Sequence, residues 1–230
     1  MALYAIADLH LSLGADKPMD VFPGWENYVS RLQKNWCATV GPQDTVVVAG
    51  DISWAMHLED AAPDFRFIQS LPGRKLILKG NHDYWWSTRK KIDQFLTENG
   101  FSSIGIIHNC AEAVGKLAVC GTRGWLYNAE SGEDKKIVSR EVGRLSASLD
   151  DAVKTGKKPV VFLHYPPIYD GMECSEIMDV LVNRGVSDCY FGHIHGSAAA
   201  RCQPVTEYRG VSMHLISSDY LGFTPVPVCE

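Results

Sequence analysis

Short apolar runs that recur along this chain constrain its fold more than any other feature. They are rich in Val, Ile and Leu and are bounded by Gly, Asp or Pro, and they lie at Leu3–Ala7, Thr45–Ala49, Lys75–Leu78, Lys116–Cys120, Val160–Leu163, Cys189–Phe191 and Ser212–Ile216. Runs of this length and composition are typical of strands in the interior of a protein. The sequence therefore predicts a sheet protein with buried strands.

Amphipathic segments between these runs predict helices. They lie at Trp25–Val40, Ser87–Asn99, Lys135–Thr155 and Cys174–Asn183. Alternating strands and helices predict βαβ units in the first half of the chain. The second half has a denser run of strands, which fits two facing sheets flanked by helices better than one doubly wound sheet. We expect one α/β domain that spans residues 1–230.

The composition is that of an ordinary globular protein. Of the 230 residues, 46% are hydrophobic and 21% are charged, which argues against disorder and suits one large domain. The net charge of -5 argues against bulk steering of DNA or RNA, although it leaves room for a local basic patch. An anionic substrate would need local positive charge, which bound metal ions can provide.

The cysteines and the chain start bear on the cellular compartment. The seven cysteines are scattered and contain no CxxC pair, and they are Cys37, Cys110, Cys120, Cys174, Cys189, Cys202 and Cys229. This pattern favours reduced thiols over a disulfide framework. We find no basic leader and no apolar stretch long enough to cross a bilayer. We therefore expect a cytoplasmic protein with no membrane partner.

Polar blocks follow five of the apolar runs, either directly or after one residue. They are Asp8-Leu9-His10, Gly50-Asp51, Gly80-Asn81-His82-Asp83, His164, and Gly192-His193-Ile194-His195. Five of the eight histidines fall in these blocks, and together with the carboxylates and one amide they could hold two divalent metal ions side by side. In a continuing strand, side chains two apart point to the same face, so Asp8 and His10 could converge on one point.

Several of these blocks have a simpler explanation when each is taken alone. An Asp after a glycine, such as Asp51, is common in turns and helix caps. A single His on an apolar strand, such as His164, is usually a buried structural residue. The Gly80-Asn81-His82-Asp83 and Gly192-His193-Ile194-His195 blocks are denser in ligand types. Because all five blocks occur together, a shared site is a better explanation than chance.

The series D-x-H, G-D, G-N-H-D, H and G-H-x-H resembles the calcineurin-like metallophosphoesterase superfamily, and every motif position is filled. The resemblance covers most of the chain. It implies a four-layer α/β/β/α sandwich of two facing mixed sheets, with the motifs at strand ends on one edge. It also implies two divalent metal ions, and mixed nitrogen and oxygen ligands suit Mn, Fe or Zn.

The resemblance also implies a role for each motif residue. The first metal would be bound by Asp8, His10 and His195, and the second by Asn81, His164 and His193. Asp51 would bridge the two metals. His82 would donate a proton to the leaving oxygen, and Asp83 would orient its imidazole. The implied reaction is hydrolysis of a phosphomonoester or phosphodiester in a small phosphorylated substrate, by attack of a metal-bridging hydroxide.

Two further matters stay open at this level. The alternative function is a non-catalytic scaffold of the same fold that binds a protein partner, against which the complete motif set argues. Trp54 and Trp85 lie beside the motifs and could form an aromatic rim or pack structurally. Arg123 ends another apolar run, where it could clamp a phosphate oxygen or be a solvated turn residue.

Overall fold

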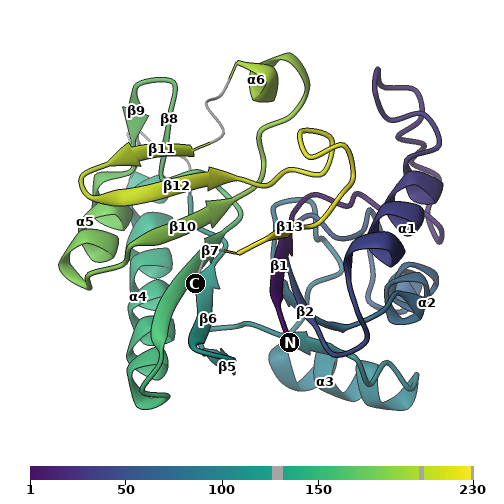
Figure 1. Cartoon of the computed structure of the whole chain (residues 1–230), viewed down its shortest axis with the longest axis horizontal. Coiled ribbons are helices and arrows are strands. Elements are labelled where there is room, and N and C mark those ends of the chain that lie inside the picture. The colour runs from purple at the N-terminus through teal and green to yellow at the C-terminus, as the bar shows by residue number, and fades with distance from the viewer. Residues whose placement is uncertain (126–131, 202–204, 229–230) are drawn as a thin grey trace.

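A computed structural model describes residues 1–125, 132–201 and 205–228 of the chain. Two sheets pack face to face (Figure 1). The first has the strand order β13-β1-β2-β3-β4 and the second has the order β11-β12-β10-β7-β6-β5. A separate hairpin pairs β8 with β9.

The strand bounds are as follows. The first sheet contains β1 (Leu3–Ile6), β2 (Thr45–Ala49), β3 (Arg74–Leu78), β4 (Ile104–Ile106) and β13 (Val226–Pro227). The second contains β5 (Glu112–Val114), β6 (Leu117–Thr122), β7 (Lys158–Leu163), β10 (Asp188–Phe191), β11 (Val205–Tyr208) and β12 (Val211–Leu215). The hairpin consists of β8 (Ile168–Tyr169) and β9 (Met172–Glu173).

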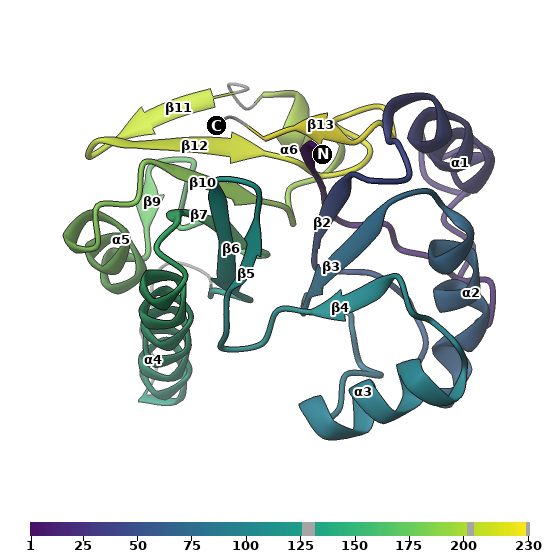
Figure 2. The ribbon, with the colours of Figure 1, turned by 60° about the horizontal axis from the view of Figure 1, so that its bottom comes forward.

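Helices cover the outer face of each sheet, as Figure 2 shows. The first sheet is covered by α1 (Tyr28–Thr39), α2 (Ala62–Ser70) and α3 (Arg89–Glu98). The second is covered by α4 (Gly132–Lys154) and α5 (Ser175–Asn183), and the short α6 (Gly196–Ala200) follows β10. A single 3-10 turn, Glu59–Ala61, leads into α2.

Alternating strand residues build the layers. In β2, Val46 and Val48 pack in the cluster under the helices, whereas Val47 packs between the sheets. In β7, Val161 faces the helix side and Phe162 faces the middle. Both faces of each sheet are therefore apolar, which explains the continuous apolar runs. The predicted four-layer α/β/β/α sandwich is confirmed.

Parallel strands bring the chemistry to one edge. Strands β1 to β4 are mutually parallel, as the predicted βαβ units require, and so are β6, β7, β10 and β12. The two sheets meet where β1 and β12 end, because Ala7 N–H donates to Ile216 O at 2.8 Å and Ser218 N–H donates to Ala7 O at 3.0 Å. The carboxyl ends of both parallel sets therefore meet at one edge of the sandwich.

Some element boundaries differ from the prediction. The helix expected from Trp25 begins at Tyr28, because Asn27 lies in the left-handed region with φ 53°. The first strand ends at Ile6, before the predicted Ala7. Helix α2 and the short strands β4, β5, β8, β9, β11 and β13 were not expected from the sequence, because their few residues carry too little periodicity to stand out.

The described residues also bear on thiols and membranes. Within them, Cys37, Cys110, Cys120, Cys174 and Cys189 are free thiols, as predicted. Cys202 and Cys229 lie outside the described residues. None of the described helices combines the length and apolar character that a membrane crossing requires.

Candidate metal centre

The segments that follow β1 and β2 run side by side and join the first two polar blocks. Asp8 N–H donates to Gly50 O at 2.9 Å, and His10 N–H donates to Asp51 O at 2.9 Å. Gly50 has φ 92°, and a Cβ there would lie 2.7 Å from Nδ1 of His164. A glycine at this position thus allows the imidazole from the second sheet to approach the backbone.

Left-handed backbone sets the direction of four of the predicted ligands. Their φ angles are 60° at Asp8, 45° at His10, 50° at Asp51 and 73° at His193. Such angles are uncommon outside glycine, and Asp and His adopt them more readily than most residues do. Asp8 and His10 therefore do not converge as neighbours on a continuing strand, which was our expectation. They converge because the backbone turns sharply after the strand has ended.

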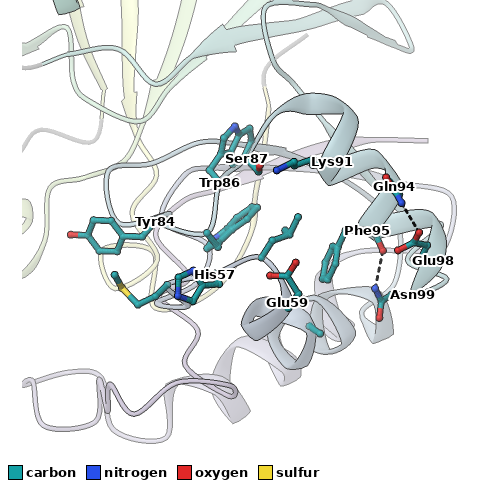
Figure 3. Close-up of a pocket in the computed structure, with 14 residues that line it drawn as sticks. His57, Glu59, Tyr84, Trp86, Ser87, Lys91, Gln94, Phe95, Glu98 and Asn99 are labelled. Carbon is teal, nitrogen blue, oxygen red and sulfur yellow. Dashed lines mark hydrogen bonds between the residues drawn. The ribbon is translucent and has the colours of Figure 1, made fainter.

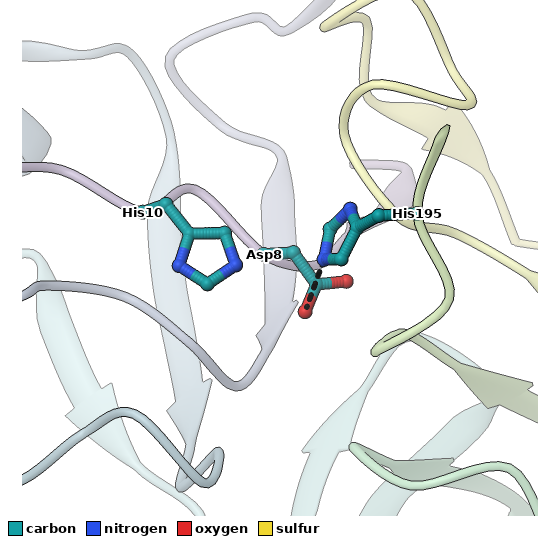
Figure 4. A group of neighbouring side chains, drawn as sticks. All are labelled: Asp8, His10 and His195. Atoms are coloured by element: carbon teal, nitrogen blue, oxygen red, sulfur yellow. Dashed lines mark ion pairs between the residues drawn. The ribbon is translucent and has the colours of Figure 1, made fainter. Parts of the chain in front are cut away.

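One group of ligand atoms is formed by Asp8, His10 and His195, all within 4.8 Å of one another (Figure 4). Oδ1 of Asp8 lies 3.5 Å from Nε2 of His195. The ring centroids of His10 and His195 are 5.3 Å apart. These residues come from the ends of β1 and β10, so both sheets contribute.

A second group adjoins the first and is formed by Asp8, Asp51 and His164. Oδ2 of Asp51 lies 3.5 Å from Nε2 of His164 and 3.7 Å from Nε2 of His10. Oδ1 of Asn81 lies 2.6 Å from Nε2 of His164. The His193 ring lies 5.1 Å from the His164 ring, centroid to centroid. The structure thus brings all the predicted metal ligands together, with Asp51 between two histidines.

Unpartnered polar atoms show that the residues fit metal ions. Oδ1 of Asp8 and Nε2 of His195 are buried and have no hydrogen-bond partner among the described residues. Buried polar atoms normally have a partner, because leaving one unpaired costs free energy. Carboxylate oxygens and imidazole nitrogens are ligands of Mn, Fe and Zn. A divalent cation between these atoms would satisfy both.

The protonation of the site follows from burial. Burial lowers the pKa of His10 to about 3 and that of His193 to about 4, so both imidazoles are neutral, the form that binds metal. Burial and the neighbouring Asp8 raise the pKa of Asp51 to about 8. Without a cation, this site therefore retains protons that a metal ion would displace.

Asp83 does not have the role that we expected for it. Its carboxylate accepts hydrogen bonds from the backbone N–H groups of Asp51 (3.0 Å), Ile52 (2.8 Å) and Gly80 (2.7 Å), and also from Nε1 of Trp85 (3.0 Å). These bonds occupy both oxygens and fasten the loops after β2 and β3 together. The expectation that Asp83 orients the His82 imidazole is wrong, because the carboxylate points into the loops instead.

His82 has another neighbour. Its Nδ1 lies 3.3 Å from the hydroxyl oxygen of Tyr84. Its backbone N–H donates to Oδ1 of Asp51 at 2.8 Å, which holds His82 beside the centre of the site. Its ring packs 4.4 Å from the Trp54 ring, and Trp54 in turn stacks on His10 at 5.0 Å. Trp54 therefore belongs to the wall of the site.

Asp219 supports one of the predicted ligands and was not among the site residues expected from the sequence. Its Oδ1 lies 2.8 Å from Nδ1 of His195, and its Oδ2 accepts from Gly196 N–H at 2.8 Å. Burial alone would lower the pKa of His195, but Asp8 and Asp219 raise it to about 10. Asp219 comes shortly after the apolar run Ser212–Ile216, so the rule that identified the other blocks could have found it.

The aromatic residues after the third block have separate roles. Trp85 is 2% exposed and belongs to the core under the helices. Tyr84 is 53% exposed, and with Trp86, His57 and Lys91 it lines an open pocket beside the site (Figure 3). Trp85 therefore packs structurally, whereas Tyr84 and Trp86 are available to a ligand.

Comparison with known proteins agrees with this fold and site. Residues 1–197 match the model of the calcineurin-like phosphoesterase family, and the chain belongs to that family. No curated protein sequence matches the chain significantly.

Solved structures show the same fold in proteins of very different sequence. The TT1561 protein of Thermus thermophilus is similar with a TM-score of 0.61 and 12% identity, over 98% of this chain and 97% of that one. The phosphopantetheinyl hydrolase of Mycobacterium tuberculosis is similar with a TM-score of 0.53 and 14% identity, over 99% of this chain and 95% of that one. At such identities the likeness concerns the fold.

Proposed function

We propose that this protein is a dimetal-dependent phosphohydrolase that cleaves a phosphomonoester or phosphodiester in a small phosphorylated substrate. The supporting observation is the position of Asp51, whose Oδ2 lies 3.7 Å from Nε2 of His10 and 3.5 Å from Nε2 of His164. A carboxylate between two groups of ligands suits the bridge of a two-metal site. The family to which the chain belongs supports the same chemistry.

The ligand set suits an anionic substrate. Two divalent cations would neutralise the oxygens of the phosphoryl group and acidify the attacking water. Among the proposed ligands only Asp8 and Asp51 carry carboxylates, and the others are the amide of Asn81 and imidazoles, which are neutral when they bind metal. The loaded site would therefore keep a net positive charge, which attracts the phosphoryl group to an otherwise acidic protein.

His82 is our candidate for the proton donor to the leaving oxygen. It is half-buried at the mouth of the site, with its ring 5.7 Å from that of His10. Burial lowers the pKa of its imidazole, so the ring gives up a proton more readily once it is protonated. The Tyr84 hydroxyl beside Nδ1 can hold the ring so that Nε2 is directed to a substrate.

The free thiols of the described cysteines support the reducing cytoplasm as the compartment of this protein.

The test is hydrolysis by metal-loaded protein. The purified protein is stripped with a chelator, reloaded with Mn, Fe or Zn in turn, and assayed with para-nitrophenyl phosphate and with its bis ester. We expect turnover only after loading, and its loss in Asp51→Asn. The preferred ester distinguishes a phosphatase from a phosphodiesterase. A protein that contains both metals and hydrolyses neither ester would instead support the non-catalytic scaffold.

A further inference from the structure

A small pocket lies beside the metal centre, at the ends of the next strands outward on the two sheets. Lys79 and His108 come from the ends of β3 and β4, and Arg123 comes from the end of β6. Lys79 is two residues before Asn81 in the chain. The carbonyl oxygen of Arg123 accepts from His164 N–H at 3.1 Å. The pocket therefore adjoins the half of the centre that Asn81 and His164 form.

Cations outnumber anions around this pocket. It is lined by Lys79, Arg123 and Arg144. Arg144 binds the fully buried Glu141 at 2.6 Å, and Arg123 lies 3.8 Å from the same carboxylate oxygen. Within the described parts of the chain, Lys79 forms no ion pair, and Glu141 is the only carboxylate paired with either arginine. The Asp83 carboxylate also acts electrostatically on Lys79, so two carboxylates face three cations among the described residues, which leaves the pocket with positive charge.

Two hydrogen-bond donors in the pocket lack an acceptor. Nε of Arg123 and Nε1 of Trp86 are buried, and neither has a hydrogen-bond partner among the residues that the structure describes. Both residues line the pocket. Donors without acceptors cost free energy, and an oxyanion, which only accepts, would satisfy them. Thr122 already donates its hydroxyl hydrogen to Glu141 at 2.5 Å, so it does not compete for the ligand.

We propose that this pocket binds a second phosphoryl group of the substrate while the group to be cleaved lies at the metal centre. The positive charge and the unpartnered donors favour an oxyanion as the ligand. Because the pocket lies next to Asn81 and His164, we infer that this oxyanion and the group to be cleaved belong to the same substrate molecule. The proposal rests on the proposed phosphohydrolase function, and it narrows the substrate class to phosphate esters that carry a further phosphoryl group.

The experiment compares two substrates that differ only in this group. Metal-loaded protein is assayed for phosphate release from 1,3-propanediol monophosphate and from 1,3-propanediol bisphosphate, and longer diol bisphosphates cover other spacings. The variants are Lys79→Gln and Arg123→Gln. Lys90→Gln is the matched control, because Lys90 is an exposed residue of α3 that does not line the pocket. Titration calorimetry measures the binding of the same compounds to each variant.

We expect the wild-type protein to prefer at least one bisphosphate, with kcat/KM about tenfold or more above that of the monophosphate, as one or two charge-assisted hydrogen bonds would give. Lys79→Gln and Arg123→Gln should each reduce this ratio about fivefold or more, whereas Lys90→Gln should keep it. Since each bisphosphate carries two equivalent ester groups, their number alone raises its kcat/KM above that of the monophosphate. A preference no larger than this overturns the proposal. So does an equal loss for both substrates, which would mean that these cations contact the cleaved group itself.

Calorimetry separates this proposal from the proposed function. If no ester is hydrolysed but bisphosphate still binds more tightly than monophosphate, and Lys79→Gln removes the difference, the phosphohydrolase proposal fails and the second phosphoryl site stands. If monoesters are hydrolysed but neither binding nor turnover distinguishes the two compounds, the site is refuted and the phosphohydrolase remains.

Discussion

Oδ1 of Asp219 accepts a hydrogen bond from Nδ1 of His195 at 2.8 Å, which leaves Nε2 of the same ring directed at Asp8. A carboxylate behind a ligating histidine fixes its tautomer and orientation. We expect Asp219→Asn to weaken metal binding by about 10–100-fold, the usual effect of removing such a partner. Chelator competition measures this.

Asp188→Asn is the control for that prediction. Oδ1 of Asp188 lies 3.1 Å from Nε2 of His214, so it forms a similar pair in the same sheet, but neither residue belongs to the proposed ligands. The variant should bind metal as the wild type does. Unchanged affinity in Asp219→Asn would show that the pair does not support a ligand.

Gly80 is predicted to be indispensable because of its close approach to Asp51. A Cβ at Gly80 would overlap with both N and Oδ1 of Asp51. Gly80→Ala should therefore destabilise the protein by about 1–3 kcal/mol or more, the usual cost of overpacking, and should reduce metal content. Urea unfolding and metal analysis measure the two effects.

Gly143→Ala provides the comparison. Gly143 lies inside α4, and a Cβ there would meet nothing within 4 Å. Since alanine is the better helix former, this variant should be more stable by about 0.5–1 kcal/mol. If both glycines tolerate alanine equally, the approach of Gly80 to Asp51 does not constrain the site.

The metal-free protein should lose stability as the pH rises from 7 to 8. The folded-state pKa values of Asp51 and His195 are raised to about 8 and about 10, above their ordinary values of 3.8 and 6.5. At these two groups the folded protein binds more protons than the unfolded chain, so their contribution to stability falls with rising pH, by on the order of 1–2 kcal/mol. Above pH 8, Lys75 opposes this trend, because burial lowers its pKa to about 8.

The trend can be measured by urea unfolding of chelator-treated protein, repeated in small steps across this window of about one pH unit. Asp51→Asn has no proton to lose at this position and should show a shallower decline. A midpoint that rises across the same window would contradict the assignment of these two groups.

Removing the His82 imidazole should affect turnover far more than metal binding. General acid catalysis typically contributes about 10²–10⁴-fold, so His82→Ala should reduce kcat by about a hundredfold or more. Its metal content should stay that of the wild type. If the substrate is an ester with an activated leaving group, the loss should shrink, because such a leaving group needs no proton. An equal loss for activated and unactivated esters would refute the role.

The sequence predicted the layers well because buried strands leave a strong local signal. Runs such as Val160–Leu163 are apolar at successive positions, since one face meets the helices and the other meets the second sheet. The short edge strands β5 and β13 carry no such signal. Their pairing depends on neighbours far away in the chain, as between Tyr4 and Pro227.

The types of residue in the site were easier to predict than the directions in which their side chains point. The family pattern identified the residues that the fold brings together, but the contacts of Asp83 depend on a turn that folds its carboxylate back onto the N–H groups of Asp51 and Gly80. Asp219 was missed for a related reason. Its place shortly after the run Ser212–Ile216 made it a candidate, but its pairing with His195 depends on the neighbouring ends of β10 and β12, and parallel pairing of that kind is not visible in local sequence.

The left-handed backbone at Asp8, His10, Asp51 and His193 limits which amino acids the centre can accept. At these positions a β-branched or bulky residue would strain the backbone, whatever ligand atom its side chain offered. Randomised libraries should consequently recover mainly Asn, Asp, His and Gly there. His164 and Asn81 carry no such restriction, and anyone wishing to retune the metal preference of this scaffold should begin with those two.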